Sequence, residues 1–122
     1  RLFQGTLSDM IERYDIIRHA ELYHNDIAIA AVEQDIDRVT AAKAADELLT
    51  LRGVRASFVL FKHDTGVNLS ARSLGEINVQ LIMEKLGGGG NRSAAGAQIP
   101  NCSLRDAVNR LFAAIDEYRA TD

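Results

Sequence analysis

The sequence has one cysteine, no long apolar run and no excess of positive charge. The single cysteine, Cys102, cannot form an internal disulfide, which favours a reducing cytosolic setting and a structural role for this residue. No apolar segment approaches the roughly 18 residues of a membrane-spanning helix, and no signal-peptide pattern opens the chain. We therefore expect a cytoplasmic domain that makes no direct membrane contact.

The charge balance narrows the class of ligand. The formal net charge is -3 and the pI is near 5.6, whereas proteins that bind long nucleic acids usually carry a basic face. A small anionic ligand needs only a local group of donors. Arg72, Lys85 and Arg92 lie close in sequence to a run of glycines and could provide them.

Catalytic and metal-binding patterns are also missing. His19, His24 and His63 do not stand at the spacings typical of metal ligands. Cys102 has no neighbouring histidine, and no serine shows an evident triad. We predict that this chain binds no metal and does not catalyse a reaction by itself.

The pattern that is present is that of one α/β domain. The chain has 122 residues, of which 47% are hydrophobic and 25% charged, and this suits a single domain with a modest core. Helical spacing predicts a first helix from Leu7, with apolar positions that recur as far as Ile17, and further helices over 37–53, 76–86 and from 103 onward. Short apolar or alternating runs predict strands over 27–32, 57–61, 67–72 and 94–99. The sum is a single compact domain with a mixed sheet of about five strands flanked by helices.

Local residues indicate where these elements begin and end. Asp37 or Thr40 can cap the second helix, and Gly53 is placed to stop it. Residues 64–66, Asp-Thr-Gly, suit a tight hairpin connection. Ser103 resembles the first residue of a capping box for the last helix.

The run from Gly87 to Gly90 is unusual, because ordering four glycines costs more conformational entropy than a simple turn requires. Their bare amides could approach a phosphate or a base closely. A flexible linker explains the run equally well. The run fits neither a Walker A loop nor a dinucleotide fingerprint, since it follows a helix and no lysine comes after it in the required place.

Polar residues stand on both sides of the glycines. Arg72 and Ser73 end the strand 67–72, whose alternation turns Arg72 toward solvent or a ligand, and a guanidinium suits bidentate contact with phosphate. A solvated edge arginine is the competing interpretation. Asn91 and Arg92 add donors after the glycines and would by themselves be ordinary loop residues.

The segment from Asn68 to Gly90, NLSARSLGEINVQLIMEKLGGGG, with its continuation NRSAAGAQ, closely resembles the DHH-associated C-terminal domain of DHH-family phosphoesterases. Within that family the chain is most similar to the membrane-anchored bacterial cyclic-di-AMP phosphodiesterases. The resemblance covers essentially the whole chain. It implies that residues 1–24 form a connector helix from an upstream DHH catalytic domain and that residues 25–122 form a substrate-binding domain.

The resemblance also implies an activity for the longer protein, namely hydrolysis of cyclic-di-AMP to the linear dinucleotide. In that family Mn²⁺ is held by aspartates and histidines of the DHH domain, and the associated domain closes over the metal and holds a cyclic dinucleotide or short oligonucleotide. The residues that match the family's ARS segment and glycine motif, with the two that follow, are the expected substrate contacts: Arg72, Ser73, Gly87, Gly88, Gly89, Gly90, Asn91 and Arg92.

The chain departs from the family at Asn91, where a histidine normally follows the glycines. Asparagine can donate and accept hydrogen bonds but cannot take a proton. Asn91→His in the full protein is therefore expected to tighten binding or speed turnover, unless asparagine is a tolerated replacement. An oligoribonuclease or single-strand exonuclease of the same superfamily and a noncatalytic nucleotide- or nucleic-acid-binding module stay open as alternatives, as does a homodimer.

Overall fold

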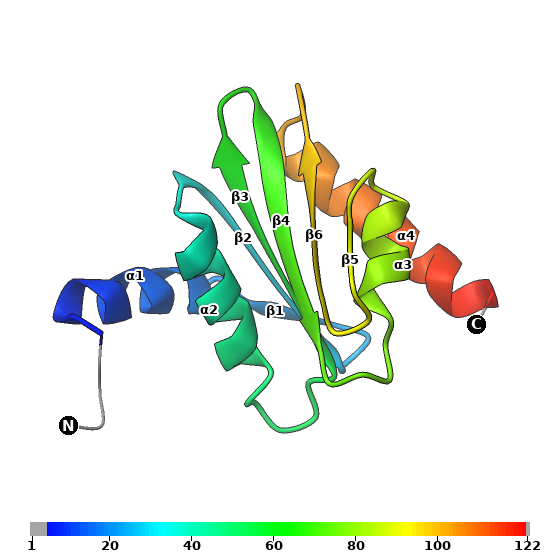
Figure 1. The fold of residues 1–122 in the computed structure, drawn as a ribbon, viewed down its shortest axis with the longest axis horizontal. Coiled ribbons are helices and arrows are strands. Elements are labelled where there is room, and N and C mark those ends of the chain that lie inside the picture. Colours follow the sequence, from blue (N-terminus) through cyan, green and yellow to red (C-terminus); the bar gives the residue numbers. More distant parts are fainter. Residues whose placement is uncertain (1–4, 122) are drawn as a thin grey trace.

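The computed structural model describes residues 5–121, which form four helices and a six-stranded sheet (Figure 1). The predicted class, a single α/β domain with a mixed sheet flanked by helices, is confirmed. The helices are α1 (Leu7–Ile17), α2 (Arg38–Leu48), α3 (Val79–Glu84) and α4 (Leu104–Thr121). The strands are β1 (Glu21–Tyr23), β2 (Ile27–Asp35), β3 (Ala56–His63), β4 (Gly66–Ser73), β5 (Gly89–Gly90) and β6 (Ala94–Ile99).

The strands lie in the order β1-β2-β3-β4-β6-β5. β2 and β3 are parallel and α2 is the crossover between them, whereas the other neighbouring pairs are antiparallel. β3 and β4 form the predicted hairpin, in which His63 lies opposite Gly66 and Asp64 has a left-handed φ of 52°. The two edges of the sheet are occupied by β1 and β5, which have three and two residues.

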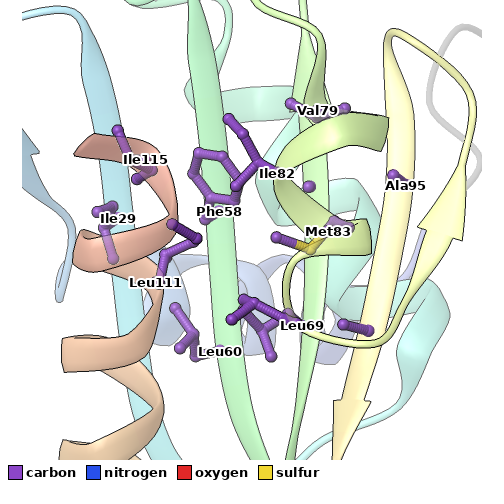
Figure 2. Close-up of a cluster of buried hydrophobic side chains, with 14 of the residues drawn as sticks. Ile29, Phe58, Leu60, Leu69, Val79, Ile82, Met83, Ala95, Leu111 and Ile115 are labelled. Atoms are coloured by element: carbon purple, nitrogen blue, oxygen red, sulfur yellow. The ribbon is translucent and has the colours of Figure 1, made fainter. Parts of the chain in front are cut away.

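Helices cover both faces of the sheet and bury two separate cores. The first core lies between the sheet and helices α3 and α4, and Figure 2 shows Phe58 of β3 in it, near Ile82 of α3 and Leu111 of α4. The second core lies between the sheet and helices α1 and α2. The α2 residues in it are mostly alanines, so the helix can approach the sheet closely: Ala41, Ala44, Ala45 and Leu48.

The first helix ends at Ile17, so the prediction that it continues to near His24 is wrong. Residues 21–23 instead form β1, which pairs antiparallel with β2. His24 and Asn25 adopt left-handed φ angles of 57° and 70° in the turn that joins them. Backbone pairing with β2 makes residues 21–23 a strand, and tertiary pairing of this kind overrides a weak side-chain pattern.

α1 leaves most of its apolar stripe outside both cores. Leu7, Met10, Ile11 and Tyr14 are between 46% and 73% exposed, and Ile16 is the buried residue of this helix. The role of residues 1–24 as a connector, and the domain boundary at residue 24, stay predictions. Residues 1–4 and 122 lie outside the described part.

Other boundaries differ by a few residues from the predicted ones. α3 is shorter than 76–86 because the Asn78 side chain caps it, accepting hydrogen bonds from the backbone of Gln80 and Leu81. Asp37, one of the two predicted caps, caps α2. Gly53, with a φ of 84°, lies in the turn before β3 and not at the end of α2. Over residues 5–121, no helix has both the length and the apolarity that crossing a bilayer requires.

Candidate functional site

A hollow of about 730 Å³ lies on the sheet face that carries α2. α2 contacts the neighbouring strands β3 and β4, and β6 and β5 continue the sheet on the side of β4 that faces away from α2 (Figure 1). Residues of α2, of β3, β4 and β6, and of the glycine run line this hollow: Arg38, Val39, Ala42, Phe61, Asn68, Leu69, Ser70, Arg72, Gly87, Gly88, Gly89, Ala94, Ala95, Gly96, Ala97 and Gln98.

Part of the floor of the hollow is polar because side chains alternate along a strand. In β4 the odd-numbered residues from 67 to 71 pack in the first core, with Leu69 also bordering the hollow, and Asn68, Ser70 and Arg72 line the hollow. This is the alternation that the sequence predicted. In β6, Gly96 and Gln98 stand on the same face. The floor therefore offers amide and hydroxyl groups, which both donate and accept hydrogen bonds.

Arg72 brings a positive charge to this floor. Its Nε lies 3.2 Å from Oδ1 of Asp46 on α2, and its Nη1 donates a hydrogen bond of 2.8 Å to the carbonyl of Ala71. The side chain is 22% exposed. These two contacts hold the guanidinium in place and leave its remaining N–H groups available to an anion.

Three of the four glycines are required by the backbone. Gly87 has a φ of 84°, and the amide of Gly88 donates to the carbonyl of Met83, so this pair closes the turn after α3. A Cβ on Gly88 would collide with the carbonyl oxygen of Gly96. Gly90 has a φ of 145° and no room for a Cβ. The fold alone therefore explains Gly87, Gly88 and Gly90.

Gly89 has no such structural reason. Its φ lies outside the left-handed region, and a Cβ there would meet nothing within 4 Å. Gly89 pairs with Gly96 of β6, and directly opposite residues of antiparallel strands point to the same face. Because Gly96 lines the hollow, the missing side chain of Gly89 keeps that hollow open.

Ser73 and Arg92 bind each other beside the hollow. The Ser73 hydroxyl donates to the Arg92 carbonyl at 3.2 Å, and the Arg92 guanidinium donates to the Gly75 carbonyl at 2.9 Å. Ser73 is only 6% exposed. These bonds join the end of β4 to the turn 91–93, and contact of either residue with a ligand stays a prediction.

Asn91 also has a partner within this turn. Its Oδ1 accepts hydrogen bonds from the backbone N–H groups of Ser93 and Ala94, at 3.0 and 2.9 Å. A histidine has no oxygen that could accept both bonds. Any gain in ligand contact from Asn91→His would therefore be opposed by a less ordered turn.

Asn91→Ala is expected to lower the free energy of unfolding by about 1 kcal/mol, because two backbone N–H groups lose their acceptor and regain only water. Asn91→Asp keeps the acceptor oxygen and should retain most of the stability. Chemical denaturation followed by circular dichroism compares the two variants. An equal loss of stability in both variants would show that the acceptor oxygen of residue 91 does not hold the turn.

The structure brings together only part of the predicted set. Arg72, Gly87, Gly88 and Gly89 line the hollow, whereas Lys85 pairs with a glutamate of α4. Polar and small lining residues that the predicted set did not include are Arg38, Asn68, Ser70, Gly96 and Gln98. Continuing the alternation through 94–99 would have found the last two. No local signal points to Arg38, because the packing of α2 on the sheet places it.

The three histidines have other partners and do not line the hollow. His24 lies 3.3 Å from Asp116, and His19 contacts a backbone carbonyl. A hydrogen bond from the Tyr23 hydroxyl is the main reason that the pKa of Asp116 is lowered. Among residues 5–121, no group of three or more His, Cys, Asp or Glu side chains is arranged to hold a metal ion. These residues therefore do not fit a manganese site.

Comparison with known proteins gives a consistent result over nearly the whole chain. Residues 24–121 match the DHHA1 domain. The chain is 44% identical over 115 residues to the cyclic-di-AMP phosphodiesterase PdeA of Listeria monocytogenes, covering 92% of this chain and 18% of that protein. It is 44% identical over 123 residues to the cyclic-di-AMP phosphodiesterase GdpP of Bacillus subtilis, covering 97% and 19%. The chain thus spans less than a fifth of these relatives.

Two further similarities are more distant. The chain is 40% identical over 67 residues to the bifunctional oligoribonuclease and PAP phosphatase NrnA of Thermus thermophilus, covering 55% of this chain and 21% of that protein. The solved structure of an exopolyphosphatase-related protein from Bacteroides fragilis has a TM-score of 0.83 at 18% identity, covering 97% of this chain and 37% of that one. This structural likeness shows a shared fold.

Proposed function

This chain belongs to the DHHA1 domain family, and we propose that it is the substrate-binding domain of a phosphodiesterase that hydrolyses cyclic-di-AMP. The proposal depends chiefly on the 44% identity to two cyclic-di-AMP phosphodiesterases over nearly the whole chain. The hollow beside α2 supports it, because a glycine run and an arginine line the same open space. Its volume of about 730 Å³ falls in the ordinary range for small-molecule sites.

The lining suggests how a dinucleotide would be held. Arg72 can bind a phosphate group through the free N–H groups of its guanidinium, and Arg38 of α2 adds a second positive charge to the hollow. Asn68, Ser70 and Gln98 present donors and acceptors that suit base edges and ribose hydroxyls. Gly89 allows the ligand to approach the backbone closely.

We assign the hydrolysis itself to the rest of the protein. One water molecule would be added, one phosphodiester P–O bond would break, and a linear dinucleotide would leave. The upstream DHH domain would supply the ligands for Mn²⁺, which residues 5–121 do not provide. The present domain would hold the substrate against that centre, and positioning of this kind accounts for a large share of catalysis. We place it on the cytoplasmic side of a membrane-anchored bacterial protein, with a homodimer left open.

The test is to express the chain together with its upstream sequence and to measure Mn²⁺-dependent hydrolysis. Cyclic-di-AMP should be converted to the linear dinucleotide faster than a linear dinucleotide or a short RNA is degraded. The piece of residues 1–122 should show no turnover under the same conditions, because its described residues lack a metal cluster.

The outcomes separate the competing functions. Preference for the linear dinucleotide or the RNA would favour the oligoribonuclease, an alternative supported by the shorter similarity to NrnA. Binding of cyclic-di-AMP without hydrolysis of any substrate would favour a noncatalytic module. Clear turnover by residues 1–122 alone would overturn the assignment of catalysis to the upstream domain.

A further inference from the structure

Asp46 of α2 touches the arginine of the hollow but does not line the hollow itself. Resting on the binding role proposed above, we propose that Asp46 is a positioning residue that fixes the guanidinium of Arg72 for an anionic ligand. Its Oδ1 lies 3.2 Å from Nε of Arg72. Nothing in the sequence pattern connects these two residues.

The carboxylate reaches the guanidinium from outside the ligand space. The Asp46 side chain is 63% exposed, whereas that of Arg72 is 22% exposed. Asp46 engages the Nε edge, and Nη1 donates to the carbonyl of Ala71. The Nη2 group and the second hydrogen of Nη1 are left over, and together they can form a bidentate contact with phosphate oxygens. Asp46 therefore restrains Arg72 without occupying the place of the ligand.

α2 holds Asp46 in a fixed position. Arg38, Ala42 and Asp46 recur every fourth residue and share one face of the helix, and the first two line the hollow. The preceding residue, Ala45, is fully buried, and its carbonyl accepts a hydrogen bond of 2.6 Å from the buried hydroxyl of Ser57. The backbone that carries the carboxylate is thus anchored to the sheet.

The expected effect lies in binding more than in stability. Exposed ion pairs add little to the free energy of unfolding. A free arginine, however, must lose its rotamer freedom when a ligand binds, and the ion pair removes most of that loss in advance. Without Asp46 we expect cyclic-di-AMP binding to weaken by about three- to tenfold.

The test uses the full-length protein. The Kd for cyclic-di-AMP is measured by calorimetry in EDTA, which prevents turnover, and KM and kcat are measured with Mn²⁺. Asp46→Ala should raise Kd and KM, and Asp46→Glu, which keeps a carboxylate on an exposed side chain, should restore most of the affinity. Glu47→Ala is the matched control: it removes a carboxylate from the next position of α2, where the partner is Arg13 at 3.3 Å. Glu47→Ala should change neither Kd nor KM.

A double-mutant cycle separates positioning from a general charge effect. Arg72→Ala should weaken binding more than Asp46→Ala does, and adding Asp46→Ala to Arg72→Ala should cause no further loss. Additive losses, or unchanged or tighter binding by Asp46→Ala alone, would overturn the positioning role. If Arg72→Ala itself leaves the affinity unchanged, or the unmodified protein does not bind, the proposed ligand site fails as well.

Discussion

Replacing Gly88 with alanine is expected to lower the free energy of unfolding by about 3 kcal/mol, at the upper end of the usual effect of overpacking. The added Cβ would collide with the carbonyl oxygen of Gly96 and lie 2.7 Å from Cα and Cβ of Ala97. These atoms belong to β6, whose backbone is fixed by pairing with β4. Because these backbone atoms cannot rotate away, the turn at Gly88 must move away from β6. Urea denaturation followed by circular dichroism measures the loss.

Gly89→Ala is the matched control, since it makes the same chemical change one residue further along. Its Cβ would meet nothing within 4 Å, so the stability should stay within about 0.5 kcal/mol of the unmodified protein. If Gly88→Ala proved as stable as Gly89→Ala, the result would contradict the close contact between Gly88 and β6.

Gly89→Val is expected to weaken cyclic-di-AMP binding by about tenfold or more while the domain stays folded. The Cβ position is open, and β-branched residues are favoured in strands. The isopropyl group would point to the face of the hollow and fill the space into which the ligand must fit. Calorimetry with the full-length protein measures the affinity.

The series at Gly89 also has an internal check. Gly89→Ala should give a smaller loss of affinity than Gly89→Val, because the effect depends on the volume added. Thermal unfolding of each variant establishes that the fold is kept. A folded Gly89→Val protein with unchanged affinity would remove the glycine run from the ligand site.

Side-chain periodicity predicted the elements that bury side chains. β2, β3, β4, β6, α2 and α4 occupy the expected segments, with ends shifted by a few residues. β1 and β5 were not predicted as strands. The two residues of β5 are glycines, which carry no pattern, and backbone pairing with β6 makes them a strand. Such pairing depends on the tertiary fold and not on the local sequence.

The lining of the hollow was predictable where a single strand or run carries it. Arg72 and Gly87 to Gly89 do lie together at the hollow. The roles of Ser73 and Asn91 within the turn could not be foreseen, because the partners of a loop side chain depend on the loop conformation. Arg38 lines the hollow from α2 and Asp46 contacts Arg72 from the same helix, and only the packing of this crossover helix sets their place.

The two shortest strands have a consequence for the solubility of the domain. A long unpaired edge is a template on which other chains can add strands and aggregate. β1 offers three residues and β5 two, and the φ of 145° at Gly90 departs from regular strand geometry. An incoming strand could therefore gain only a few main-chain hydrogen bonds from β1 or β5 themselves. These two strands, which side-chain patterns did not predict, cover part of each edge, because β1 pairs with residues 27–29 of β2 and β5 with Ala95 and Gly96 of β6.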